Sequence, residues 1–295
     1  MFFSELSKAV GNELLNKAKS MEKISDIDIL NKPIAKGLEN SGKYDLPECD
    51  TSELDPNSTY DIDGDICETD DNGNVYKKNG ELQPDSTYVM NGVTYTTDSQ
   101  GRITSWSGAP SYTPENNRDT SAQSDAGGDD RQEGDDGGHL VARVLGGSSD
   151  IGNIVPMRDT INRGDYKCSE NEIASALKEG KQVIDSGKVT YDDTNRPQKI
   201  ERTYTIDGEK TECDYDNVKG SQDLLENVEG CISDEDYENL QNEISDMKED
   251  GCEVSVTSVT KKYDANGNLQ TVRVGITNET TGEKTYKTYQ ISKEV

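Results

Sequence analysis

Large apolar side chains are scarce in this chain. Only 30% of its 295 residues are hydrophobic, and two Phe and one Trp stand against 14 Tyr. Any hydrophobic core must therefore be modest, with Tyr supplying much of the large packing surface and solvated loops lying between the cores. The length fits one to three domains, at least one of them with a sizeable core.

Long apolar runs are also lacking, and no stretch is long enough to span a membrane. The first twenty residues contain no apolar signal-peptide core. Residues 4–23 have the apolar spacing of a short helix, and residues 31–52 have the Pro and Gly content of a linker. We therefore expect no membrane partner, and secretion or delivery to a target cell would need a non-classical route, with a cytoplasmic location left open.

Basic residues are outnumbered, with 31 Lys and Arg against 59 Asp and Glu and a net charge of -28. Such a charge counts against casual binding of a polyanion, because neutralisation of phosphates drives nucleic-acid affinity. Residues 143–210 differ, since they hold 11 basic and 12 acidic residues. Most of the acidity lies outside this segment, where it serves either solubility or regulation.

The six cysteines include no Cys-x-x-Cys pair. Cys49 and Cys67 are 18 positions apart, as are Cys213 and Cys231. This spacing is compatible with two local disulfides in an exported protein, although six cysteines allow 15 connectivities.

Residues 53–105 contain an internal repeat with an offset of 28 positions. Its copies are ELDPNSTYDIDGDICETDDNGNV from Glu53 and ELQPDSTYVMNGVTYTTDSQGRI from Glu81. Each copy alternates apolar and polar residues around an Asp-Gly or Asn-Gly turn, which predicts a β-hairpin. The acidic Asp61-Ile62-Asp63-Gly64-Asp65 run resembles a calcium loop, but its Gly comes too early and no Glu closes the twelfth position. We therefore interpret this run as a hairpin turn and not as a calcium-binding loop.

The pattern after the repeat predicts both loops and regular elements. Residues 107–138 are rich in Gly, Asp, Ser and Asn, which is typical of a long mobile loop. Periodicity and capping signals predict a strand over 139–145, a helix that begins within 159–162, a helix capped by Ser169 and Glu172 that ends near Lys178, paired strands over 182–191 and 198–206, acidic helices within 221–249, and strands within 253–293.

Histidine occurs once, as His139, between two glycines and the apolar run Leu140-Val141-Ala142. Two asparagines, Asn153 and Asn162, and an acid, Glu170, follow it. Taken singly, each of these residues is more often structural, since Asn is common at turns and Glu favours helix starts. Their order along the chain carries more information than any one of them.

The series Asp136-Gly137-Gly138-His139-Leu140, Gly152-Asn153-Ile154-Val155-Pro156-Met157, Asn162 and Glu170 resembles the DNA/RNA non-specific endonuclease family. Members of this family are ββα-metal (His-Me finger) nucleases that carry Asp-Arg-Gly-His, Asn-x-x-Pro-Gln, Asn and Glu in this order. The resemblance covers roughly residues 95–217 and is nearest to a bacterial branch of secreted nucleases and toxin domains. Gly137 replaces the usual Arg and Met157 the usual Gln, which leaves the phosphate-binding group open.

The resemblance implies a metal-dependent phosphodiester hydrolase. His139 would be the general base that takes a proton from water. Asn162 would offer its amide oxygen to Mg²⁺, with Mn²⁺ as a substitute, and Glu170 would orient a water molecule at that ion. Asn153 would position the substrate strand or a water molecule.

A phosphate-binding arginine is also expected from the family. Arg118 is the first candidate because it lies upstream in the loop that must fold over the site, and Arg131 and Arg143 come next. No sequence-reading motif is visible, which suits an enzyme acting on DNA and on RNA without sequence preference. Because such an enzyme endangers its own cell, we also expect an inhibitor or immunity protein.

The sequence thus predicts an α+β fold, with a ββα-metal nuclease core and an antiparallel sheet. The expected parts are an N-terminal helix and linker over 1–52, the tandem repeat over 53–105, the nuclease core over 106–217, and an α+β tail over 218–295. The expected function is that of a secreted nuclease or antibacterial toxin. The alternative is a non-catalytic binding or adhesion protein whose nuclease core is vestigial.

Overall fold

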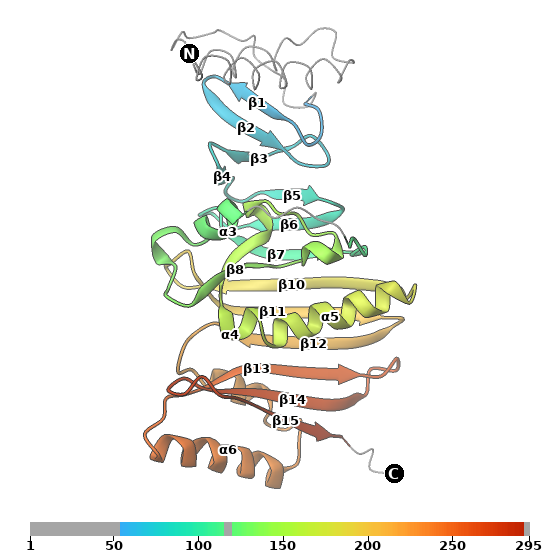
Figure 1. The fold of residues 1–295 in the computed structure, drawn as a ribbon. Coiled ribbons are helices and arrows are strands. Elements are labelled where there is room, and N and C mark those ends of the chain that lie inside the picture. Colours follow the sequence, from blue (N-terminus) through green and yellow to red (C-terminus); the bar gives the residue numbers. More distant parts are fainter. Residues whose placement is uncertain (1–53, 115–119, 292–295) are drawn as a thin grey trace, which may run out of the picture. The chain divides into compact units, whose positions relative to one another are not determined.

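The computed structural model describes residues 54–114 and 120–291 (Figure 1). They fall into two compact units, divided between Glu81 and Leu82. The helix expected over 4–23, the linker over 31–52 and the candidate Arg118 lie outside the described residues. Within the described part of the chain, no helix is both long and apolar enough to cross a membrane.

The first unit is built on a small antiparallel sheet whose strands follow the order β1-β2-β3-β4. The strands are β1 (Thr59–Ile62), β2 (Asp65–Thr69), β3 (Val75–Lys78) and β4 (Glu81–Leu82). At the β1–β2 turn, Asp63 and Gly64 both have positive φ, and Asp61 Oδ1 accepts a hydrogen bond from Gly64 N at 2.9 Å. The acidic run therefore forms a hairpin turn.

Three strands of the second unit repeat the pairing of β1, β2 and β3. They are β5 (Thr87–Met90), β6 (Val93–Thr97) and β7 (Ile103–Gly108), each starting 28 positions after its counterpart. Tyr60 pairs with Cys67 in the first copy, and Tyr88 pairs with Tyr95 in the second. The second pair is fully buried and its rings stack with centroids 5.4 Å apart.

A nine-stranded antiparallel sheet, of order β15-β14-β13-β12-β11-β10-β7-β6-β5, forms the frame of the second unit. Its remaining strands are β10 (Val183–Tyr191), β11 (Pro197–Ile206), β12 (Glu209–Asp216), β13 (Val254–Tyr263), β14 (Leu269–Asn278) and β15 (Lys284–Gln290). The predicted strands over 182–206 and 253–293 are thus present, because their apolar and polar residues alternate. The fold is α+β and mostly antiparallel, as expected.

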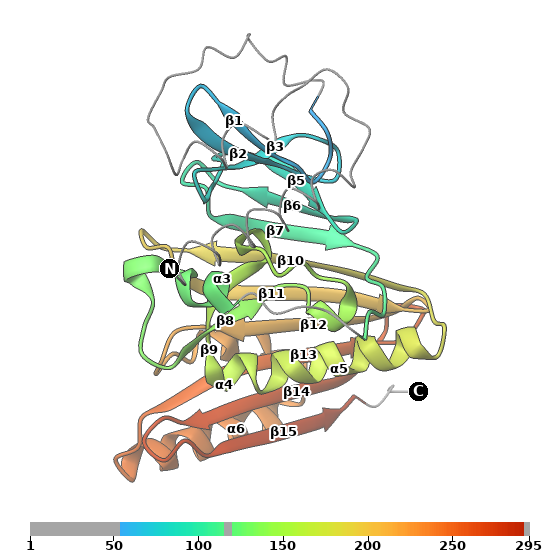
Figure 2. The same cartoon turned by 45° about the horizontal axis from the view of Figure 1, so that its top comes forward.

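Two long helices cover opposite faces of this sheet (Figures 1 and 2). Helix α6 (Asp234–Glu249) packs Leu240 and Ile244 into a cluster with alternate valines of β13 and β14. Helix α5 (Asp165–Lys178) contacts the other face, where Ser258 of β13 donates a hydrogen bond to Asp165. Because side chains alternate across a strand, β13 serves both layers.

A two-stranded antiparallel sheet of β8 (Asp135–His139) and β9 (Ile154–Arg158) precedes α5. Between β7 and β8 lies helix α3 (Thr120–Asp125), followed by the 3₁₀ turn η2 (Gly128–Asp130). The long loop predicted over 107–138 is therefore wrong in its described part, since that part contains a helix and a strand. The strand predicted over 139–145 is also wrong, because β8 ends at His139.

The start of α5 differs from the prediction too. Ser169 does not cap the helix but lies inside it, buried, with its hydroxyl donating to Tyr166 O at 2.8 Å. The helix begins at Asp165, directly after the short helix α4 (Asp159–Asn162). Its end at Lys178 agrees with the prediction, and Gly180 follows with φ of 77°.

The local disulfide between Cys213 and Cys231 that the spacing allows is not formed, since both are free thiols, and Cys67 is free as well. Burial raises the pKa of the Cys213 thiol to about 11, with smaller opposing effects of neighbouring hydrogen bonds. A thiol in this state is neutral at physiological pH and unreactive. The second unit therefore keeps Cys213 as a packing residue.

Candidate functional site

Three elements bring the predicted site residues together. His139 is the last residue of β8, where it pairs with Ile154 of β9. Asn162 ends α4, and Glu170 lies in the second turn of α5. A strand pair followed by a helix thus places an imidazole, an amide and a carboxylate around one cavity.

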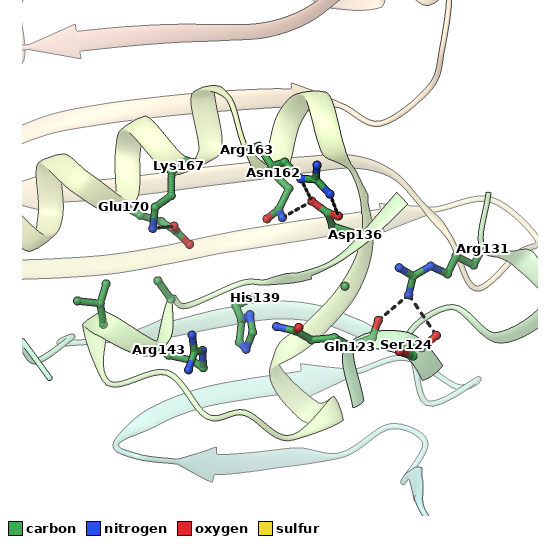
Figure 3. A pocket seen from close by; sticks show the side chains of 13 residues that line it. Gln123, Ser124, Arg131, Asp136, His139, Arg143, Asn162, Arg163, Lys167 and Glu170 are labelled. Atoms are coloured by element: carbon green, nitrogen blue, oxygen red, sulfur yellow. Dashed lines mark hydrogen bonds and ion pairs between the residues drawn. The ribbon is translucent and has the colours of Figure 1, made fainter. Parts of the chain in front are cut away.

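The cavity has a volume of about 640 Å³ (Figure 3). Five of the residues expected at the site line it: His139, Asn162, Glu170, Arg131 and Arg143. The remaining lining residues are Gln123, Ser124, Asp136, Gly137, Ala142, Val144, Arg163 and Lys167. Asn153 is absent from this lining.

The amide of Asn162 is oriented by Asp136, as Figure 3 shows. Asn162 Nδ2 donates to Asp136 Oδ2 at 2.8 Å, and Arg163 binds both oxygens of the same carboxylate, at 2.8 and 2.6 Å. Burial alone would raise the pKa of Asp136, but the bonds from Arg163 and Asn162 hold it below its ordinary value. Because an ionised carboxylate only accepts hydrogen bonds, Asn162 must direct its Oδ1 away from Asp136.

Close packing around Gly138 brings Asn162 against β8, the strand that ends in His139. A Cβ added to Gly138 would lie 3.2 Å from Asn162 Oδ1 and 2.9 Å from Met157. Met157 itself is fully buried between the strands, so it packs the core and does not face the cavity. The second glycine of the motif therefore allows the amide oxygen to sit directly over the strand that ends in His139.

The absence of a side chain at Gly137 also has a specific structural reason. A Cβ at this position would lie 2.3 Å from Gln123 O, because α3 crosses directly over β8. The arginine found here in many members of the family would have no room. Arg131 holds this crossing in place by donating to Gln123 O at 2.5 Å and to Asp135 O at 2.6 Å.

Asn153 has a structural position. Its side chain is fully buried, where Oδ1 accepts from Val141 N and from Tyr95 OH, both at 2.9 Å. Its Nδ2 donates to Val141 O at 2.9 Å and to Ser148 O at 2.7 Å. These bonds replace strand pairing for Val141, which explains why β8 stops at His139. The Asn153 amide thus makes its hydrogen bonds to other protein groups and fixes the loop after His139 in place.

Four basic residues and two acids line the cavity, a local excess of positive charge in a strongly acidic chain. Lys167 Nζ is 2.9 Å from Glu170 Oε2, and Arg163 is engaged with Asp136. The guanidinium of Arg131 is held by backbone carbonyls. Arg143 is half-buried and its side chain lies by His139 in the close view (Figure 3).

The helix that carries Glu170 is anchored from beneath by a buried ion pair. Arg202 of β11 binds both oxygens of Asp185 of β10 at 2.8 Å, and both side chains are almost fully buried. Arg202 also donates to Ser169 Oγ at 3.1 Å and stacks over the ring of Tyr166, 4.9 Å from its centroid. The ion pair between Arg202 and Asp185 thus helps to fix the position and tilt of α5.

The C-terminal strands hold α4 and α5 from a second direction. Lys284 Nζ donates to Thr160 O at 2.8 Å, and Arg273 Nη1 is 3.2 Å from Asp165 Oδ1. Lys262 binds both oxygens of Glu172, at 2.7 and 2.8 Å. The tail over 218–295, for which the sequence indicates no role, therefore supports the elements that carry Asn162 and Glu170.

Sequence reasoning missed the roles of Asp136, Arg163 and Lys167. Asp136 is part of the motif itself, and a carboxylate three positions before the histidine could have been weighed as an orienting group. Arg163 and Lys167 are four positions apart, which was an available signal for basic side chains on the same side of this segment.

The site residues thus lie around one cavity on an α+β frame, and comparison with known proteins gives a family match for this part of the chain. Residues 84–208 match the family model of the DNA/RNA non-specific endonucleases. This match confirms the resemblance of the motifs.

Particular relatives also match. Over 100 residues the chain is 40% identical to the type VII secretion system protein EssD of Staphylococcus aureus, in strains USA300 and NCTC 8325 / PS 47. EssD of strain Newman matches to the same extent. The alignment covers 32% of this chain but only 16% of the length of these relatives.

Proposed function

We propose that the chain is a Mg²⁺-dependent endonuclease that cleaves DNA and RNA without sequence preference. The observation that carries the proposal is the meeting of His139, Asn162 and Glu170 in one basic cavity. The family match of residues 84–208 supports the same reaction. Mn²⁺ is expected to replace Mg²⁺, since both accept oxygen ligands.

The residues present fit a hard divalent cation. Asn162 Oδ1 faces away from Asp136 and over Gly138, and Glu170 lies on the same cavity wall. Amide and carboxylate oxygens are the ligands that Mg²⁺ prefers, usually few in number, with phosphate completing the set. When bound, the cation would stabilise the negative charge that develops on the phosphate and on the departing oxygen.

The protein residues would divide the remaining work. His139 would accept the proton of the attacking water, as a positioned general base. Asn162 would hold the cation by its oxygen, and Glu170 would orient a water molecule beside it. Arg118, the first candidate for the phosphate ligand, lies outside the described residues. Of the other two candidates we prefer Arg143, because Arg131 is committed to backbone carbonyls. Asn153 would support the loop after His139, in place of the expected positioning of the substrate strand or a water molecule.

Metal removal tests the proposal directly. Purified chain is expected to degrade plasmid DNA and structured RNA in Mg²⁺, to stop in EDTA, and to resume when Mg²⁺ or Mn²⁺ is added in excess. A gel assay over several pH values measures this. Failure to cleave either polymer with any divalent cation would favour the non-catalytic binding or adhesion protein.

Asp136→Ala tests the orientation of Asn162. Removal of this carboxylate frees the amide to rotate, so the Mg²⁺ concentration for half-maximal cleavage is expected to rise by about tenfold to a hundredfold, the usual effect of losing a group that orients a metal ligand. Asp129→Ala, an exposed acid of η2, is the matched control and should leave the requirement unchanged. An unchanged Mg²⁺ requirement in Asp136→Ala would contradict the assignment.

We also propose that the nuclease is exported and is restrained by an inhibitor protein in the producing cell. The proposal rests on the likeness to EssD, a type VII secretion system protein, and on the hazard of an active nuclease. Expression of the chain alone in a bacterial host should arrest growth, and His139→Ala should relieve the arrest. Harmless accumulation of active enzyme would count against an inhibitor.

A further inference from the structure

Tyr112 is an exposed aromatic side chain beside the elements that form the cavity. It is 37% exposed, and among the described residues only three other large apolar side chains are comparably exposed. Its ring is held by Lys178, whose Nζ lies 4.7 Å from the ring centroid. The exposed part of the ring remains accessible to a second planar group.

The backbone fixes Tyr112 in place. Ser111 N donates to Leu145 O at 3.1 Å, and Thr113 N donates to Val144 O at 2.9 Å. Alternate residues of an extended segment are therefore tied to the 3₁₀ helix η3 (Arg143–Leu145). Since the ring is already ordered, a ligand that stacks on it would lose little affinity to ordering.

The two elements that hold Tyr112 also form a wall of the cavity. Arg143 and Val144 of η3 line it, as do Lys167 and Glu170 of α5, while Lys178 is the last residue of the same helix. Lys178 lies eight positions after Glu170, a rise of about 12 Å along the helix. That distance corresponds to about three to four nucleotides along one strand of a duplex.

The exposed face of α5 connects the two places. Lys167 and Lys178 are eleven positions apart, close to three whole helical turns, so both lie on one side of the helix. Both are exposed, and the exposed Asn171 lies between them, one turn after Lys167. The surface from the cavity to Tyr112 thus presents positive or neutral polar groups at these positions, in a chain whose net charge is -28.

We propose that Tyr112 and Lys178 form a subsite for the nucleic-acid strand that flanks the cleaved bond. A base would stack on the exposed part of the Tyr112 ring, and Lys178 would bind a neighbouring phosphate. Stacking on an aromatic ring combined with a basic track is how proteins hold single strands without reading sequence, because every base has a flat face. The subsite rests on the proposed function and adds that the enzyme binds the strand beyond the cleaved bond.

Binding in a non-cleaving background tests the subsite independently of catalysis. In the His139→Ala chain, a fluorescein-labelled 12-nucleotide single-stranded DNA is titrated by fluorescence anisotropy. Tyr112→Ala is expected to raise the Kd by about tenfold, within the range for loss of one stacked base, while Tyr112→Phe keeps it. Lys178→Gln should raise the Kd and reduce its salt dependence by about one phosphate contact.

Tyr286 provides a matched control. It is 39% exposed and carries Arg273 over its ring at 4.1 Å, but it lies on β15 and outside the cavity lining. Tyr286→Ala should leave the Kd unchanged, and so should Lys219→Gln, which removes an exposed lysine paired with Glu253. An equal loss in Tyr286→Ala would show a non-specific effect and overturn the subsite.

A small substrate separates the subsite from a structural role. Bis(4-nitrophenyl) phosphate spans only the cavity, so Tyr112→Ala with His139 intact should hydrolyse it at the normal rate and show a normal Tm. A fall in either value, an unchanged oligonucleotide Kd, or no oligonucleotide binding at all would overturn the proposal. If the wild-type chain hydrolyses no phosphodiester yet Tyr112→Ala weakens DNA binding, the proposed function fails and the subsite stands.

Discussion

His139→Ala is expected to lower kcat for plasmid cleavage by about 10²- to 10⁴-fold, with KM little changed. This is the range that a positioned general base contributes. The chain has no second histidine, so no other imidazole can take over the proton. Single-turnover rates at saturating Mg²⁺ measure the effect without interference from product release.

Added imidazole distinguishes loss of the base from collapse of the cavity. Truncation at residue 139 leaves space in the cavity, and a small base in solution can enter it. We expect partial recovery of His139→Ala activity with millimolar imidazole at neutral pH, and none for Asn162→Ala. Wild-type kcat in His139→Ala would exclude the residue as the base.

Asp185→Ala is expected to lower the free energy of unfolding by about 3–5 kcal/mol, the usual effect of leaving one charge of a buried pair uncompensated. Arg202 and Asp185 are almost fully buried, and the variant would strand the guanidinium between β10, β11 and α5. Burial would otherwise lower the pKa of Arg202, and the carboxylate of Asp185 holds it well above its ordinary value. Urea unfolding followed by circular dichroism measures the change.

A surface pair is the control for this variant. Glu179 lies 2.8 Å from Lys181, and both side chains are exposed. Glu179→Ala should change stability by less than about 1 kcal/mol, because solvent screens an exposed pair. A similarly small change in Asp185→Ala would mean that the buried pair does not anchor α5.

The strands of the large sheet were predictable because each carries its own alternation. Residues 182–206 and 253–293 alternate apolar and polar side chains, and the residues of each strand that face one layer can be read locally. In contrast, β8 reads Asp-Asp-Gly-Gly-His, with no strand propensity. Its conformation is imposed by β9 and by the buried ion pair of Arg196 with Asp135, partners that local patterns do not show.

The candidate site was also predictable in part, because the order of its residues can be read from the sequence. The order of His139, Asn162 and Glu170 follows the family motif, and all three line one cavity. Asn153 belongs to the same motif, but its side chain forms hydrogen bonds with Val141, Ser148 and Tyr95. Only three-dimensional contacts separate an amide that holds the loop from an amide that faces the cavity.

The glycines of the motif illustrate the limit of motif comparison. Gly137 appeared as the loss of a phosphate-binding arginine, whereas the structure shows α3 occupying the space of any side chain there. Basic groups come instead from η3, α4–α5 and the segment that ends at Arg131. The chain therefore keeps a positive cavity while changing the elements that supply it.

The most direct test of the central claim compares His139→Ala, Asn162→Ala and the double variant in one single-turnover cleavage assay. If the imidazole and the amide serve one reaction at one phosphate, their effects are not independent, and the double variant should be no slower than the slower single variant. Rate losses that multiply in the double variant, or a single variant with the wild-type rate, would contradict a shared site.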